Sequence, residues 1–163
     1  MQSIQTVSEN TIYVGASDRR LAKFENLFPI PRGVSYNAYV ILDEKTALLD
    51  TADASVGAQF LENVAAALDG RKLDYLIVDH MEPDHAAMIE AVLVRWPDLR
   101  LVVNAKTLPM LKMYFPTDSA AFDDALVVKE GDTLDLGKHK LTFVMAPMVH
   151  WPEVMMTFDT TTG

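Results

Sequence analysis

The chain has 163 residues, of which 50% are apolar and 23% charged, a composition typical of a folded globular core rather than of disorder. Asp and Glu number 23 against 14 Lys and Arg, and the net charge of −9 disfavours nucleic acid and anionic membrane surfaces as partners. Because there is no cysteine, disulfides, thiol catalysis, zinc fingers and iron–sulfur clusters are excluded, and any metal must be held by histidine and carboxylate.

The first third of the chain is predicted to form short strands and turns. Residues 12–14 are a strand candidate, and residues 28–33, which contain two prolines and a glycine, are predicted to form a loop. Residues 39–42 and 46–49 are apolar runs on either side of a polar Asp-Glu-Lys turn, which predicts a β-hairpin.

Three helices are predicted from apolar residues that recur at helical spacing: Phe60, Leu61, Val64 and Leu68; Ile89, Val92, Leu93 and Trp96; and Leu108, Leu111 and Phe115. Ser55 is expected to be the N-cap of the first helix, which Gly70 ends. Pro97 and Pro116 are expected to end the second and the third.

The remaining strands are predicted from short apolar runs: residues 75–78, 101–103, 126–128, 133–136, 141–145 and 154–158. The first two runs are unbroken, as in strands that are buried on both faces. This interleaving of strands and helices predicts an α/β fold of layered mixed sheets. Residues 159–163 have turn chemistry but no returning strand, so we expect the chain to be the N-terminal part of a longer domain.

Four side chains that can bind metal fall within six positions: His80, Glu82, Asp84 and His85. They follow a predicted buried strand, at the end where α/β folds commonly bind ligands. The two-residue period of extended chain places His80 and Glu82 on one side, and Pro83 keeps this stretch extended. Asp84 and His85 begin a helix and point elsewhere. Two ligand pairs presented in different directions suit two adjacent metal ions, which the carboxylates neutralise and the imidazoles bind through nitrogen.

The same residues have simpler structural interpretations. Asp84 could be only a helix N-cap and Glu82 a solvated loop residue, with both histidines incidental. Four such groups in six positions, in a chain with only four histidines, favour the metal interpretation. Asp50, Asp53 and Asp79 lie near strand ends and could accept hydrogen bonds from ligating histidines, or could only cap turns or face solvent.

Two further histidines lie later in the chain. His150 follows the predicted strand 141–145, and because both histidine-bearing loops come after core strands, they could meet at one edge of the sheet. The alternative is that His150, beside Trp151, is a core residue. His139 lies between two lysines in a turn and is expected to be solvated and without a functional role.

Residues 80–85, His-Met-Glu-Pro-Asp-His, resemble the H-x-E-x-D-H motif of the flavodiiron proteins, also called A-type flavoproteins. This motif is a variant of the H-x-H-x-D-H motif of metallo-β-lactamase-fold hydrolases. Residues 150–153, His-Trp-Pro-Glu, are similar to the H-W-P-E segment that carries the family's next ligand, and residues 33–39 and 48–51 also look familial. The resemblance covers almost the whole chain and implies that residues 1–163 are the N-terminal portion of a metallo-β-lactamase-like di-iron domain.

The resemblance implies an αββα sandwich that carries two non-haem iron ions. By this analogy, His80, Glu82 and His150 bind one iron, and Asp84 and His85 bind the other. Glu82 stands where the hydrolases have histidine. Its negative charge and hard oxygen ligand favour iron over zinc.

The resemblance also implies an oxidoreductase. Members of the family reduce O2 to water, NO to N2O, or both, with electrons from FMN in a flavodoxin-like domain that is absent from this chain. In this electron transport, a redox partner such as a rubredoxin or a flavin reductase transfers electrons to the FMN. The full-length proteins of the family are head-to-tail homodimers. The family has a bridging Asp and a further His at positions beyond residue 163. We therefore expect the isolated chain to bind metal weakly or partially and not to turn over.

Three alternatives remain open at this point. The first is a zinc-dependent hydrolase of the metallo-β-lactamase fold, which would use zinc-bound hydroxide as its nucleophile. The second is a di-iron oxygen sensor without a flavodoxin domain, and the third is an inactive piece of a domain.

Location is predicted from what the sequence lacks. No apolar run approaches the roughly 20 residues that a membrane span needs. The first residues also lack the basic-then-apolar profile of a signal peptide. A cytoplasmic location is therefore expected.

Overall fold

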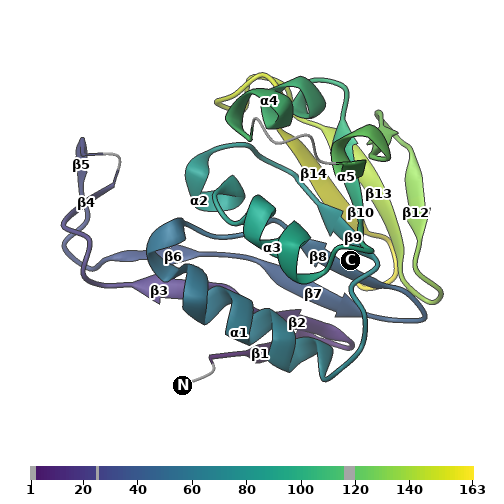
Figure 1. Cartoon of the computed structure of the whole chain (residues 1–163), viewed down its shortest axis with the longest axis horizontal. Coiled ribbons are helices and arrows are strands. Elements are labelled where there is room, and N and C mark those ends of the chain that lie inside the picture. Colours follow the sequence, from purple (N-terminus) through teal and green to yellow (C-terminus); the bar gives the residue numbers. More distant parts are fainter. Residues whose placement is uncertain (1–2, 25, 116–119) are drawn as a thin grey trace.

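The computed structural model describes residues 3–24, 26–115 and 120–163, and its centre is a seven-stranded mixed sheet (Figure 1). In spatial order the strands are β1 (Gln5–Ser8), β2 (Thr11–Tyr13), β7 (Tyr39–Leu42), β8 (Thr46–Leu49), β9 (Tyr75–Ile77), β10 (Arg100–Asn104) and β11 (Leu126–Val128). Neighbours from β1 to β8 pair antiparallel, whereas β8, β9, β10 and β11 pair parallel.

Helices cover one face of this sheet, and a small antiparallel sheet covers the other (Figure 1). The helical elements are η1 (Ala54–Val56), α1 (Gly57–Leu68), α2 (Pro83–Ala86), α3 (Ile89–Arg95), α4 (Thr107–Tyr114) and α5 (Ala120–Asp123). The small sheet has the order β12 (Thr133–Asp135), β13 (Lys140–Met145) and β14 (Met155–Asp159). Two short pairs complete the described part of the chain: β3 (Ala16–Asp18) with β6 (Val34–Tyr36), and β4 (Lys23–Phe24) with β5 (Phe28–Pro29).

Alternate residues of the central strands belong to two different cores. In β9, Leu76 packs in the core beneath the helices, whereas Ile77 packs in the core between the two sheets. Val102 of β10 and Phe143 of β13 also belong to the core between the sheets, and all four side chains are fully buried. Burial on both faces explains the unbroken apolar runs and confirms the predicted α/β class.

The layers observed are helices, the large sheet and the small sheet, which are three of the four layers of an αββα sandwich. The exposed positions of β14 are apolar, since Met156 is 53% exposed and Phe158 is 50% exposed. None of the described helices is long and apolar enough to cross a membrane.

Most of the predicted elements are confirmed, including the 39–49 hairpin, the three long helices and the later strands. Ser55 is not an N-cap: Asp53 occupies that role for η1, accepting a hydrogen bond from Ser55 N at 2.8 Å, and α1 begins only at Gly57. The predicted loop 28–33 begins with strand β5. The predicted stop at Pro116 lies outside the described residues.

The prediction that His139 is solvated is wrong, because its side chain is buried. Its Nδ1 lies 2.7 Å from Asp159 Oδ2, and its backbone N–H donates to Asp43 Oδ2 at 2.6 Å. His139 continues the alternation that buries Leu141 and Phe143, so its ring turns inward although both flanking lysines are exposed.

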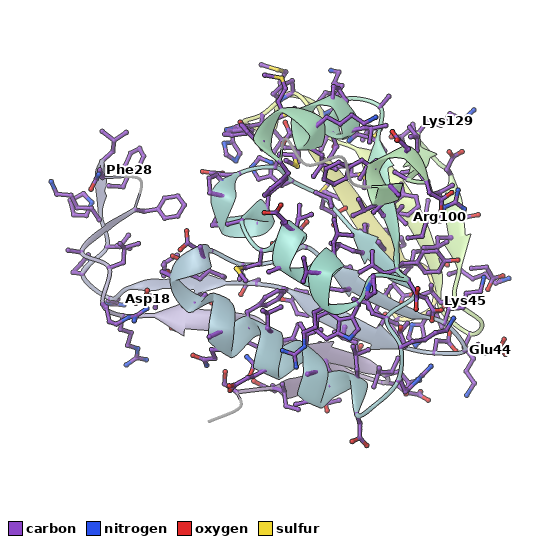
Figure 2. All side chains as sticks on the ribbon, viewed as in Figure 1. Asp18, Phe28, Glu44, Lys45, Arg100 and Lys129 are labelled. Atoms are coloured by element: carbon purple, nitrogen blue, oxygen red, sulfur yellow. The ribbon has the colours of Figure 1, made fainter. Side chains whose placement is uncertain are left out.

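An ion pair between the buried Asp18 and the exposed Arg20 secures the segment that leads from β8 to α1. Asp18, at the base of the protruding β4–β5 hairpin that carries Phe28, is 4% exposed (Figure 2). Its carboxylate accepts hydrogen bonds from Arg20 Nε at 3.1 Å and Nη2 at 2.9 Å, and the same Nη2 donates to Ser55 O at 3.0 Å. The hydrogen bonds from Arg20 lower the pKa of Asp18 to about 2.

This pKa predicts a contribution to stability that disappears in acid. Because the folded pKa lies below the unfolded value of 3.8, the contribution is complete above about pH 4 and is lost as the pH falls toward 2. We expect Asp18→Asn to lower the urea midpoint at pH 7 and the difference from wild type to shrink between pH 4 and pH 2. The exposed Asp98→Asn is the control, and a constant difference across this range would contradict the assignment.

Candidate metal centre

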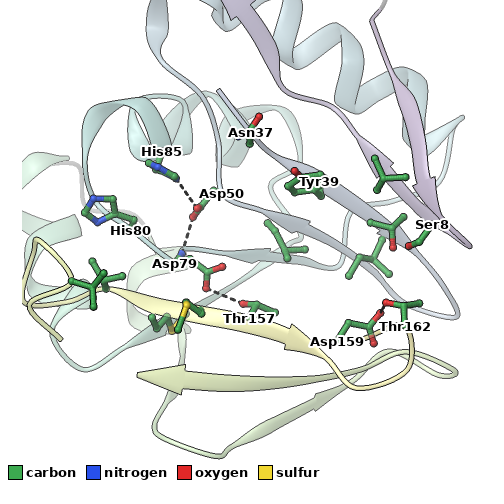
Figure 3. Close-up of a pocket in the computed structure, with 18 of the residues that line it drawn as sticks. Ser8, Asn37, Tyr39, Asp50, Asp79, His80, His85, Thr157, Asp159 and Thr162 are labelled. Carbon is green, nitrogen blue, oxygen red and sulfur yellow. Dashed lines mark hydrogen bonds and ion pairs between the residues drawn. The ribbon is translucent and has the colours of Figure 1, made fainter. Parts of the chain in front are cut away.

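The candidate site forms where two neighbouring parallel strands end. Asp50 directly follows β8, and His80 lies three residues after the last residue of β9. Asp50 N donates to Ile77 O at 2.9 Å, which continues the ladder, and Asp50 Oδ1 accepts from Asp79 N at 2.7 Å (Figure 3). The φ angle of Asp50 is 54°, a left-handed conformation that Asp tolerates better than most residues. The two strands thus present their polar ends at one edge of the sheet.

Three of the predicted site residues converge on one point. His80 Nε2 lies 3.0 Å from Glu82 Oε2 and 3.0 Å from His150 Nε2. His150 Nε2 lies 3.1 Å from the same Glu82 oxygen. His80 and Glu82 are 6% and 7% exposed, so the simpler interpretation of Glu82 as a solvated loop residue is wrong. Two imidazole nitrogens and a carboxylate oxygen at such mutual distances could share a single cation.

The loop between β13 and β14 carries His150 to this point. Met148 and His150 have φ angles of 66° and 45°, and Met148 N donates to Trp151 O at 2.9 Å. The two histidine-bearing loops therefore meet at one edge, as the sequence predicts. The side chain of His150 is 60% exposed, so the alternative of a core histidine is wrong.

The other nitrogen of His80 contacts Glu153, the carboxylate of the His-Trp-Pro-Glu segment, for which the sequence predicts no role. Glu153 Oε1 lies 2.8 Å from His80 Nδ1 and accepts from Met81 N at 3.0 Å. An ionised carboxylate only accepts hydrogen bonds, so the ring donates from Nδ1 to Glu153, and Nε2 is the ring atom that faces Glu82 and His150. No local sequence signal identifies this pairing, because the partners are 73 positions apart.

Asp84 and His85 form a second pair beside the first group. His85 Nε2 lies 3.7 Å from Asp84 Oδ2, and the rings of His80 and His85 are 5.2 Å apart. Asp84 is not an N-cap, since Glu82 holds that position of α2 without a side-chain hydrogen bond. Asp84 Oδ1 is buried and has no hydrogen-bond partner among the described residues. The structure thus places this pair next to the first, and its role as a ligand pair stays a prediction.

The electrostatics of the second pair reflect its carboxylates. Burial alone would lower the pKa of His85, but the hydrogen bond and charge of Asp50, whose Oδ2 lies 2.8 Å from Nδ1, together with Asp84 and Glu82 raise it to about 9. Burial raises the pKa of Asp84, an effect that the nearby His85 opposes. A bound cation could therefore replace the proton of His85 or neutralise the carboxylate of Asp84.

The three carboxylates suggested as partners of the histidines have different roles. Asp50 contacts His85, as that suggestion requires. Asp53 caps η1 instead. Asp79 joins β9 to β14, because its Oδ1 accepts from the Thr157 hydroxyl at 2.8 Å and its carbonyl accepts from Met155 N at 3.0 Å.

A cavity of about 570 Å³ opens beside the histidines. Figure 3 shows His80 and His85 at one end and Asp159 and Thr162 at the other, with β14 along one side. A second cavity of about 340 Å³ is lined by other residues, among them Glu82 and Asp84. The group thus has one cavity on the side of its histidines and another on the side of its carboxylates.

The donor set fits iron. It consists of imidazole nitrogens and carboxylate oxygens without a thiolate, which suits ions such as Fe²⁺ and Mn²⁺. The buried oxygen of Asp84 without a partner is an acceptor that a cation would satisfy. The fold and this site together define a metallo-β-lactamase-like domain, with a glutamate in its candidate metal-binding group.

Comparison with known proteins agrees with this class. Residues 34–163 match the family model described as ODP family beta lactamase. The match covers most of the chain, so the protein belongs to this family.

Its relatives are flavodiiron proteins and nitric oxide reductases. The chain is 36% identical over 153 residues to a nitric oxide reductase of Moorella thermoacetica, covering 93% of this chain and 38% of the relative. It is 36% identical over 156 residues to an anaerobic nitric oxide reductase flavorubredoxin of Klebsiella pneumoniae, covering 94% and 32%. The rubredoxin oxygen:oxidoreductase of Desulfovibrio gigas superposes with a TM-score of 0.89 at 31% identity, covering 96% of this chain and 38% of that one. The chain thus spans about two fifths or less of the length of these relatives.

The geometry predicts how removal of one converging residue affects cation binding. We expect His150→Ala to weaken Co²⁺ binding by at least the roughly 10- to 100-fold seen when an outer partner is removed, since a direct ligand would be lost. Because His150 is exposed, although alanine tolerates its left-handed backbone less well than histidine, the free energy of unfolding should fall by no more than about 1 kcal/mol. Optical titration with Co²⁺ and urea unfolding measure the two effects, and unchanged Co²⁺ affinity would exclude His150 as a ligand.

Proposed function

We propose that the chain supplies iron ligands to a flavodiiron oxidoreductase that reduces O2 to water, NO to N2O, or both. The observation that carries this proposal is the convergence of His80, Glu82 and His150, with a buried glutamate in the first metal-binding group. The names of its relatives support the same chemistry, since they include a nitric oxide reductase and an oxygen oxidoreductase.

His80, Glu82 and His150 would hold one iron ion, and Asp84 and His85 would hold the second. The short distances within the first group and the free oxygen of Asp84 support this division. When bound, two ferrous ions supply electrons and open positions for O2 or NO.

The residues of the chain prepare this site in three ways. Glu153 and Asp50 accept hydrogen bonds from Nδ1 of His80 and His85, so that each ring directs Nε2 toward its proposed ion. Glu82 and Asp84 provide negative charge next to the cations. The ring of Trp151 lies 5.3 Å from that of His80 in an edge-to-face arrangement and shields it from water.

We assign residues 1–163 to the N-terminal portion of the metallo-β-lactamase-like di-iron domain of a longer protein. FMN would bind a flavodoxin-like domain outside this sequence, and a rubredoxin or a flavin reductase would supply electrons. A head-to-tail homodimer would bring the flavin of one subunit to the irons of the other. The names flavorubredoxin and diflavin flavoprotein among the relatives support the flavin. The cytoplasmic location stays a prediction.

Metal analysis and measurements of O2 and NO consumption by the whole protein, the latter without oxygen, test this function. We expect iron in the protein as isolated and consumption of O2 or NO when a reductant is supplied. Zinc without iron, together with esterase or lactonase activity, would establish the hydrolase instead. Binding of O2 without turnover by a protein that ends after the metal domain would establish the oxygen sensor.

The identity of residue 82 predicts metal preference. We expect Glu82→His, expressed in the same medium as wild type, to lower the iron-to-zinc ratio about tenfold, because a hard anionic ligand is exchanged for a borderline nitrogen. Glu82→Asp is the matched control, since it keeps the carboxylate and therefore the preference for iron. Elemental analysis measures both, and an unchanged ratio in Glu82→His would refute this account of selectivity.

A further inference from the structure

We propose that Glu153 is a positioning residue, whose buried carboxylate fixes the tautomer and orientation of His80 and thereby joins the two loops of the metal site. The inference rests on the proposed function, because His80 is a proposed iron ligand. The role itself concerns the ring and its hydrogen bonds, so it can be tested with no metal bound.

The burial of Glu153 is the first observation. The residue is 1% exposed, and the side chain of His80 is 8% exposed. In this buried setting a hydrogen bond is strong and competing water is excluded. A carboxylate here must be matched closely to its donors, since an unmatched buried charge is costly.

Glu153 also connects two loops that are distant in sequence. Its Oε1 accepts from the ring of His80 and from the backbone N–H of Met81, both in the loop after β9. Its own backbone is held by Asn104 at the end of β10, whose Nδ2 donates to Glu153 O at 2.5 Å. Since His150 lies three residues before Glu153, the same carboxylate fixes the distance between the two loops and so places His150 Nε2 close to His80 Nε2.

The second oxygen of Glu153 indicates that the charge of this carboxylate matters, in addition to its orientation of the His80 ring. Glu153 Oε2 is buried and has no hydrogen-bond partner among the described residues. A carboxylate with a free buried oxygen gains most from a nearby positive charge. A dication on His80 Nε2 would supply that charge through the ring, and the carboxylate would in turn make the ring a more basic ligand.

Asp50 and His85 provide an internal comparison. Asp50 contacts His85 Nδ1 at 2.8 Å and also accepts a backbone N–H, that of Asp79. Two carboxylates thus hold the backbone on either side of His80, at residues 79 and 81. His85 is more open than His80, with a side chain that is 34% exposed, so Glu153 serves the more buried half of the site.

Nitrogen-15 NMR of histidine-labelled, metal-free chain tests the proposal directly. In wild type we expect Nδ1 of His80 to carry a proton that is hydrogen-bonded to a carboxylate and exchanges slowly with water. In Glu153→Leu we expect this hydrogen-bonded Nδ1–H to be lost, while the signals of His85 stay unchanged. With only four histidines, single substitutions assign the signals. An Nδ1–H tautomer of His80 that persists unchanged in Glu153→Leu would overturn the proposal.

A second measurement separates charge from hydrogen bonding. Glu153→Gln keeps an acceptor oxygen without the charge, so the tautomer should remain while Co²⁺ affinity falls about 10- to 100-fold. Glu62→Gln removes the same charge from an exposed position of α1 and should leave Co²⁺ affinity unchanged. Equal affinities of wild type and Glu153→Gln would exclude the charge effect.

The two proposals fail in different ways. If the whole protein contains zinc and no iron, the proposed function fails, but the NMR result still decides the role of Glu153. If the hydrogen-bonded Nδ1–H of His80 does not depend on Glu153, the positioning role fails, and the metal analysis still decides the proposed function. Because Glu153→Gln keeps nearly the same side-chain shape, it tests the proposal even where Glu153→Leu does not fold.

Discussion

The parallel pairing of β8 with β9 is the constraint on which the rest of the site depends. Parallel neighbours end at the same edge of a sheet, so the residues that follow them emerge side by side. Asp50 after β8 and Asp79 after β9 are therefore joined by a hydrogen bond of 2.7 Å. His80 and His85 follow directly in the segment after Asp79. The antiparallel sheet then adds His150 from the opposite layer, because β14 is tied to β9 through Asp79.

Several carboxylates lie close together at this edge, so their negative charges repel one another. Two features of the structure reduce this repulsion. Some acidic side chains are matched to histidine rings, as Glu153 is to His80 and Asp50 to His85. Protonation neutralises another carboxylate, because burial and the charge of Asp50 raise the pKa of Asp79 well above its usual range. Cations at the centre of the group would take over this compensation. A cation bound at the candidate site would thus displace protons from it.

The sequence predicts those parts of the fold that repeat over several residues. The unbroken runs of β9 and β10 and the helical spacing in α1 and α3 arise from burial against continuous layers, and burial leaves a period in the sequence. The short strands β3 to β6 have two or three residues each and lack such a period. For His139 the exposed lysines on either side indicate a solvated turn, whereas the alternation that it shares with Leu141 turns its ring inward.

The same distinction holds for the site, between what is local in the chain and what is not. His80, Glu82, Asp84 and His85 lie within six positions, and the geometry of extended chain and Pro83 suffices to place the first two on one side. The partner of His80 lies 73 positions away, and that of His85 lies 35 positions before it. Such pairs depend on which strands are neighbours, and no spacing within a motif encodes that. A motif can therefore identify the groups that face a metal, whereas the carboxylates that orient them become visible only once the sheets are assembled.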